Sequence, residues 1–482
     1  MVQDNMILTS NMIAYITKGQ WINLNSNISF HGIRVNINRI EIGDICFTSN
    51  PEQWGNKIQN TENKLQIIFE NGAKAVVMTD KNLIGNCKYP VLIVKNSKQA
   101  LEDIAFYVRD TIRIKRVLVT GTEGKTGFKN QLYRLLDYQT KAHATLDSSN
   151  LNVPILCSLA SLGSKDKVEI LEASVAEGEV GVIRSNLVRP DICVITEVGY
   201  EHISSHGSFE DLIKNKASIV DGLREGGLCV LNADSINYDK VREEIYKRKY
   251  VEIVTFGKDS KCDARLIEAN FDEEKLTWNI KASIQGKDIS YELPILGEHV
   301  PVSSLAPLLV VHLLGYNIAK AAEDYTKFLS TETMGGLNEI KTDKMTFRIY
   351  DHSHRASVLS YNSALKDLSR LQAKGGKKIA VIGNMLNIGN ISKSAHEYLA
   401  ELIENANVDK LYTIGKFTIP IHSKLKDPSI LTKHADNYKD IEDEIINDIQ
   451  DGDLLFIKGH HRIWLKDLAD KIYNLGDVHA IR

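Results

Sequence analysis

The stretch VLVTGTEGKTGF, residues 117–128, restricts the fold of this chain more than any other. It predicts a buried strand, a glycine-containing loop, and a helix that begins at Lys125. Gly121 and Gly124 allow backbone amides to approach a phosphate, and the helix N-terminus favours an anion. Lys125 can reach the outer phosphates and Thr126 can ligate Mg²⁺. The spacing GxxGKT is shorter than the usual P-loop, so a tight turn with an exposed lysine is the alternative interpretation.

Strand and helix patterns alternate on both sides of this loop. Apolar runs at 168–174, 191–199 and 227–234 predict buried strands of a mostly parallel sheet. Residues 250–295 show the alternation of antiparallel strands. The last part of the chain again alternates strands with helices, which favours a Rossmann-like domain. We therefore predict an α/β chain with three domains: an N-terminal α/β domain at 1–112, a central P-loop domain at 113–334, and a C-terminal Rossmann-like domain at 335–482.

Composition narrows the class of protein. The 482 residues carry a net charge of −3 and no long basic run, which argues against a nucleic-acid partner. No apolar stretch is long enough to cross a membrane, and the first residues lack the pattern of a signal peptide. The six cysteines are far apart and form no CxxC pair, as expected of reduced thiols. These features predict a cytoplasmic location.

Two further side chains lie at predicted strand ends. Glu172 lies near the C-terminal end of the strand 168–174, and His202 follows the strand 191–199. The carboxyl ends of parallel strands meet at one edge of a sheet, where the P-loop also lies, so both could converge with Thr126 on a metal at the nucleotide. A solvated carboxylate and a loop histidine are the alternative interpretations.

A lysine falls on the apolar face of a predicted helix. GSFEDLIKNKASIVDGL, residues 207–223, has apolar residues at helical spacing, and Lys216 lies on that stripe whereas Lys214 does not. A long lysine stem can lie along apolar surface with its ammonium in water, which is the simpler interpretation. A functional role is the alternative.

The order of these motifs resembles that of the Mur ligases, the ATP-dependent amide-forming enzymes of peptidoglycan precursor synthesis. GTEGKT, the ExS at 172–174, the region 189–223 and VLNAD are followed by LGEH (296–299), YDHSH (350–354), VIGNMLNIG (381–389) and FIKGHH (456–461). GEV and the segment that begins at VIGNMLNIG point most to the members that add D-alanyl-D-alanine. The resemblance implies an N-terminal domain that binds substrate.

The resemblance also implies roles for individual residues. Lysine at the position of Lys216 is carbamylated by CO₂ in the family, and burial favours the neutral amine that this reaction needs. The implied cofactors are ATP and two Mg²⁺ ions, one held by Thr126 and Glu172, the other by His202 and carbamylated Lys216. The implied catalytic residues are Lys125, Glu172, His202 and Lys216. The implied ATP-binding residues are Gly121, Thr122, Glu123, Gly124, Lys125, Thr126, Gly127, Ser303 and Asp351. The implied substrate-binding residues are Ser148, Ser149 and Asn150.

The implied reaction joins a small-molecule carboxylate to the amine of an amino acid or dipeptide. The carboxylate takes the γ-phosphate of ATP, the amine attacks the resulting acyl phosphate, and the three domains close to exclude water. The family's usual state is a monomer. For Asp351, which the resemblance places near the nucleotide, a turn aspartate is the alternative interpretation.

The sequence departs from the family pattern at several positions. Glu197 stands where the family has asparagine, both asparagines of the HNxxN motif are lost at 299–303, and Gly336 replaces an arginine. Residues 147–154 differ from the asparagine-rich substrate loop. Three functions therefore remain open: an amide ligase whose substrates have changed, a genuine UDP-N-acetylmuramoyl-tripeptide–D-alanyl-D-alanine ligase, and a nucleotide-binding homologue without turnover.

Overall fold

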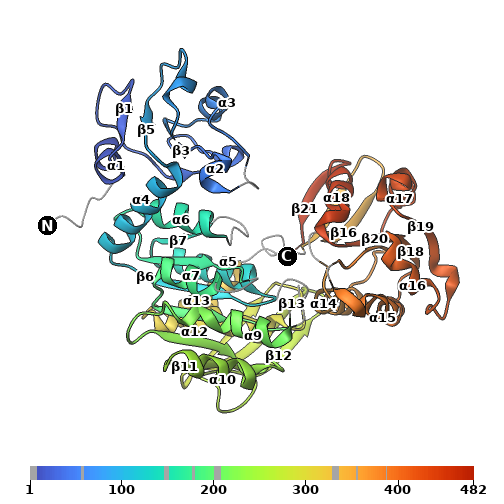
Figure 1. Cartoon of the computed structure of the whole chain (residues 1–482). Coiled ribbons are helices and arrows are strands. Elements are labelled where there is room, and N and C mark those ends of the chain that lie inside the picture. Colours follow the sequence, from blue (N-terminus) through green and yellow to red (C-terminus); the bar gives the residue numbers. More distant parts are fainter. Residues whose placement is uncertain are drawn as a thin grey trace.

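The computed structural model describes most of the chain as three α/β units, each built on its own sheet (Figure 1). The described residues are 8–55, 59–145, 151–175, 180–199, 208–327, 336–353, 356–386 and 388–481. The strands of each sheet fall within one of the three predicted ranges, while the exact domain limits stay predictions. No helix in the described ranges has the length and apolar character needed to cross a bilayer.

The N-terminal unit holds a five-stranded sheet in the order β1-β5-β4-β3-β2. Only β1 runs antiparallel to its neighbour; the other pairs are parallel. Its strands are β1 (Gln20–Ile22), β2 (Ile33–Arg34), β3 (Ile45–Phe47), β4 (Ala75–Met78) and β5 (Val91–Ile93), and its helices are α1 (Ser10–Thr17), α2 (Pro51–Trp54), α3 (Leu65–Glu70) and α4 (Ser97–Thr111).

The central unit holds a nine-stranded sheet in the order β14-β13-β12-β11-β10-β9-β6-β8-β7. Strands from β7 to β12 are parallel, and the pairs β12–β13 and β13–β14 are antiparallel. The antiparallel pattern predicted for 250–295 is therefore confirmed from β12 to β14, but it was wrong for β11, which pairs parallel with both of its neighbours. The strands are β6 (Lys115–Thr120), β7 (Ala142–Ala144), β8 (Val168–Glu172), β9 (Ile192–Ile195), β10 (Leu228–Asn232), β11 (Glu252–Gly257), β12 (Ala264–Asp272), β13 (Thr277–Ile284) and β14 (Lys287–Leu293). The helices are α5 (Lys125–Asp137), α6 (Asn152–Ala160), α7 (Val180–Val188), α9 (Phe209–Ala217), α10 (Tyr238–Arg248), α11 (Val300–Ser303), α12 (Leu305–Leu313) and α13 (Ile318–Asp324).

The C-terminal unit holds a seven-stranded sheet in the order β19-β18-β17-β20-β16-β15-β21. Its strands from β19 to β16 are parallel, and β15 pairs antiparallel with both of its neighbours. The strands are β15 (Leu337–Lys341), β16 (Thr346–His352), β17 (Lys378–Gly383), β18 (Lys410–Ile414), β19 (Leu431–Ala435), β20 (Leu454–Lys458) and β21 (Asp477–Ala480). The helices are α14 (Val358–Arg370), α15 (Ser392–Asn405), α16 (Ile419–His422), α17 (Glu442–Asn447) and α18 (Leu465–Tyr473).

The helix predicted over 207–223 is shorter than expected. In the described part of this segment, α9 begins at Phe209, capped by Ser208, and ends at Ala217. A 3₁₀ turn, Ser218–Val220, continues the apolar stripe, which is why periodicity alone did not locate the end of the helix. The six cysteines are all free thiols, as predicted.

Candidate active site

The loop between β6 and α5 has the backbone of a phosphate-binding loop. Gly121 has a φ of +149° and Gly124, the N-cap of α5, a φ of +84°. A Cβ atom at Gly121 would overlap the hydroxyl of Thr196, so this position accepts only glycine without a shift of its neighbours. The loop is therefore held in one conformation, with the N-terminus of α5 at its end.

The loop is joined to the residues after β9 by several hydrogen bonds. Thr196 donates its backbone N–H to Thr120 O and its hydroxyl to Glu123 O, at 3.0 and 2.5 Å. Thr122 donates its backbone N–H to Glu197 O at 2.6 Å, and its hydroxyl lies 3.1 Å from the N–H of Gly199. Sequence reasoning did not single out Thr196 as a site residue. A threonine directly after a buried strand, at the edge that holds the P-loop, was the available signal.

Lys125 folds back over the loop. Its ammonium donates to the carbonyls of Gly121 and Thr122 at 2.8 and 2.7 Å, and the residue is 7% exposed. The alternative of an exposed lysine at a simple turn is therefore wrong. A cation beside a glycine-containing loop and a helix N-terminus is suited to bind the phosphates of a nucleotide.

Thr126 and Glu172, predicted to share a metal, are brought together. The hydroxyl of Thr126 donates to Oε2 of Glu172 at 2.8 Å, and both residues are buried. The strand-end carboxylate is therefore not a solvated charge. A hydroxyl and a carboxylate beside a phosphate-binding loop are the hard oxygen donors that Mg²⁺ prefers, so these residues fit that ion.

Lys216 lies on the buried face of α9 and is 5% exposed, whereas the side chain of Lys214 on the same helix is 53% exposed. The prediction that Lys216 sits on the apolar stripe is confirmed. Its predicted partner at the second metal, His202, and the predicted substrate residues Ser148, Ser149 and Asn150 lie outside the described residues. Within the described part of the chain, no group of three or more His, Cys, Asp or Glu side chains forms a metal cluster.

The remaining predicted ATP-binding residues lie in different places. Gly127 is in the first turn of α5 with open space around its Cα. Ser303 ends α11, where its hydroxyl donates to Val300 O at 3.2 Å. Asp351, in β16, accepts from the N–H of Ser353 and the hydroxyl of Tyr473 at 2.9 and 3.4 Å, both within the C-terminal unit.

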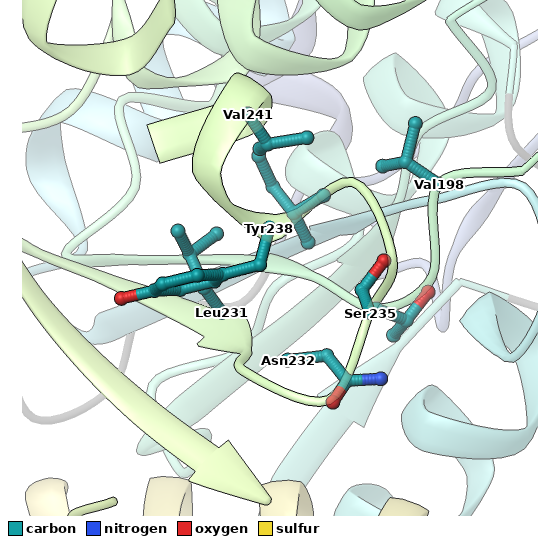
Figure 2. Close-up of a pocket in the computed structure, with 8 residues that line it drawn as sticks. Val198, Leu231, Asn232, Ser235, Tyr238 and Val241 are labelled. Carbon is teal, nitrogen blue, oxygen red and sulfur yellow. The ribbon is translucent and has the colours of Figure 1, made fainter. Parts of the chain in front are cut away.

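Glu197, where the family pattern has asparagine, is held in a polar network beside the loop. Its carboxylate accepts from Asn232 Nδ2 at 3.1 Å and from Ser235 Oγ at 2.7 Å. Burial raises the pKa of this carboxyl, and the two hydrogen bonds offset part of that effect. Figure 2 shows a small pocket here, lined by Asn232 at the end of β10, Ser235 on the loop that follows, and Tyr238 at the start of α10.

These features define a class of protein: a three-unit α/β protein with a phosphate-binding loop at the carboxyl edge of its central sheet. Residues 119–311 match the model of the Mur ligase middle domain. Two relatives named UDP-N-acetylmuramoyl-tripeptide–D-alanyl-D-alanine ligase are each 26% identical. That of Rickettsia prowazekii matches over 93% of this chain and 96% of its own length, and that of Bacillus subtilis over 83% and 85%.

Solved structures agree in fold. MurF from Acinetobacter baumannii aligns with a TM-score of 0.77 at 18% identity, over 98% of this chain and all of that one. MurF ligase from Thermotoga maritima, in complex with ADP, aligns with a TM-score of 0.69 at 20% identity, over 92% and 97%. Residues 119–311 therefore match a Mur ligase middle domain, and the chain as a whole is similar to Mur ligases in sequence and in fold. Among the Mur ligases, it is similar to the D-alanyl-D-alanine-adding enzymes along most of its length.

Proposed function

We propose that this protein forms an amide bond between a small-molecule carboxylate and the amine of an amino acid or dipeptide, at the expense of ATP. The observation that carries the proposal is the buried Thr126–Glu172 pair beside the folded-back Lys125. Full-length similarity to ligases of this kind supports it. A decayed homologue has no need to keep a buried carboxylate and two lysines at these positions.

The chain's own residues account for the first step. A carboxylate oxygen of the substrate attacks the γ-phosphorus of ATP, the bond to the β-phosphate oxygen breaks, and ADP leaves. Both reactants are anions, so Lys125 and the amides at the start of α5 offset their repulsion. Thr126 and Glu172 would hold Mg²⁺, which neutralises charge on the phosphates when bound. Carbamylated Lys216 and His202 are proposed, from the family resemblance, to hold a second ion.

In the second step the amine nitrogen attacks the acyl carbon and loses a proton, and phosphate leaves. The acyl phosphate would hydrolyse in water, so the C-terminal unit must cover the loop while it exists. We propose the cytoplasm as the location and the monomer as the working form.

Two substrate assignments are open. Similarity over 93% of the chain to a UDP-N-acetylmuramoyl-tripeptide–D-alanyl-D-alanine ligase favours UDP-N-acetylmuramoyl-tripeptide and D-alanyl-D-alanine as the substrates. The changes at Glu197, at 299–303 and at Gly336 favour other substrates for the same chemistry.

The test is ADP release by the purified protein with Mg-ATP and bicarbonate. One arm contains UDP-N-acetylmuramoyl-tripeptide with D-alanyl-D-alanine, and the other contains that carboxylate and pooled carboxylates with pooled amino acids and dipeptides. Release in the first arm establishes the cell-wall reaction. Release only in the second, with the product identified by mass spectrometry, establishes changed substrates. ATP binding without release in either arm contradicts the proposal and favours the non-catalytic homologue.

A further inference from the structure

One face of α14 lies against the central unit (Figure 1). Leu359 packs on Gly199, so closely that a Cβ atom at Gly199 would lie 2.9 Å from it. Further along, Ser363 Oγ lies 3.1 Å from Nδ1 of His299, a residue of the turn before α11. Near its end, Arg370 and Lys366 both pair with Glu298. The spacing of these contacts, three and four residues apart, places them on one side of the helix.

The residue that caps α14 touches the phosphate-binding loop itself. Ser357, the N-cap of α14, donates its hydroxyl to Oε1 of Glu123 at 2.7 Å. The same hydroxyl accepts the N–H of Ser360 at 3.1 Å. A serine hydroxyl can do both at once because it has one donor and two acceptor positions. Ser357 therefore caps its own helix and binds the loop of another unit, 234 residues away in the chain.

Glu123 is an unexpected residue between two glycines of a phosphate-binding loop. A carboxylate that faced the phosphates would repel them. Here the carboxylate turns instead toward the N-terminus of α14, where the partial positive charge of the helix favours an anion. A hydrogen bond to an ionised carboxylate is also stronger than one between neutral groups.

We propose that Glu123 is a positioning residue: its carboxylate fixes the N-terminus of α14 and thereby seats the C-terminal unit over the ATP loop. Glu123 acts here through Ser357 and not through the reacting atoms. The inference rests on the proposed function in one respect: it assumes that the ligase reaction takes place while the C-terminal unit is docked over the ATP loop. The contact itself links the loop that holds ATP to the unit that must cover it.

The experiment separates this contact from the capping of α14. Ser357→Asp keeps an N-cap acceptor for Ser360 but removes the donor and places a second carboxylate against Glu123. Adding Glu123→Gln to Ser357→Asp supplies an amide donor for the new aspartate and removes the repulsion. Ser369→Asp, on the same helix but away from Glu123, is the matched control.

The primary measurement is hydrogen–deuterium exchange of the peptides that cover α14 and the turn 296–303. We expect Ser357→Asp to raise exchange in both by about fivefold or more, with Ser369→Asp unchanged and the double variant restored toward wild type. In steady-state assays, we expect Ser357→Asp to have a higher KM for the amine than wild type and an unchanged KM for ATP. Wild-type exchange in Ser357→Asp, or no restoration in the double variant, overturns the inference. Exchange needs no turnover, so failure of the proposed function would be seen separately as absent ADP release.

Discussion

At the scale of the single residue, Lys216 is the most informative position. An ammonium group on the buried face of α9 is costly unless it is modified or paired, and the resemblance to Mur ligases supplies carbamylation as the modification. We therefore predict that carbamylation gives Lys216 a role in turnover.

Lys216→Ala is expected to lower turnover by about 100-fold or more, because a charge that acts on the transition state is lost. A short carboxylic acid such as formate or acetate should restore part of the rate, since it supplies the missing anion. Turnover is measured as ADP release with the substrate pair that supports release by the wild-type protein. The control is Lys214→Ala, an exposed lysine on the same helix. Full activity of Lys216→Ala would rule out the carbamate.

A second residue-scale prediction concerns pH. Burial raises the pKa of the Asp367 carboxyl to about 7, from an ordinary value of 3.8, although Tyr350 donates a hydrogen bond to it and Arg370 lies near. Between about pH 4 and 7 the folded state therefore keeps a proton that the unfolded state has released. The Asp367 carboxyl therefore lowers the free energy of unfolding as pH rises through that window.

Asp367→Asn removes this titration and can still accept from Tyr350. We expect the variant to gain stability relative to wild type as pH rises, by up to about 4 kcal/mol between pH 4 and pH 8, at about 1.4 kcal/mol per unit of pKa. Urea unfolding at several pH values measures it, with Asp343→Asn at an exposed turn as control. A constant difference across the range would show that Asp367 does not titrate there.

At the scale of the element, the phosphate-binding loop depends on close contact with the end of β9. Gly121→Ala would place a methyl group on the Thr196 hydroxyl, at a φ of +149° that disfavours alanine. Strain of this kind costs about 1–3 kcal/mol, so we expect ATP binding to weaken by about tenfold or more. Calorimetric titration with ATP measures the affinity. Gly163→Ala is the control, because a Cβ atom there would lie 3.6 Å from its nearest neighbour, and this variant should bind ATP as tightly as wild type. Equal ATP affinities in the two variants would show that the loop does not depend on this contact.

The elements that the sequence pattern predicted are those whose signals are local. The strand, loop and helix at 117–128 form one continuous stretch, so the phosphate-binding loop could be predicted from that stretch alone. The burial of Lys216 could be predicted in the same way, from the apolar spacing of its own helix. The pairing of Thr126 with Glu172 needed only the rule that parallel strands end at one edge. The contact of Glu123 with Ser357 spans two units and has no local signal, because each residue alone is an ordinary loop or capping residue.

At the scale of the whole molecule, the C-terminal end of α14 also joins the C-terminal and central units. The guanidinium of Arg370 pairs with Glu298 at 2.5 Å and lies 5.6 Å from the ring centre of Trp278 on β13. A cation–π contact and a partly exposed ion pair each contribute about 1 kcal/mol or less. The contacts of Arg370 are therefore strong enough to favour docking of the C-terminal unit, and weak enough to let the two units separate.

Arg370→Ala should shift the molecule toward more open forms without touching the ATP loop. We expect a larger radius of gyration in small-angle X-ray scattering, a several-fold rise in the KM for the amine, and an ATP affinity within about twofold of wild type, since the lost contacts total roughly 1–2 kcal/mol.

Arg242→Ala is the matched control: Arg242 also pairs with a carboxylate, Asp239, and lies over a ring, that of Tyr238, but within α10. An unchanged radius of gyration, or an equal rise in both variants, would show that docking does not depend on Arg370. If the radius rises and the amine KM does not, the docked arrangement is not the one in which the amine reacts.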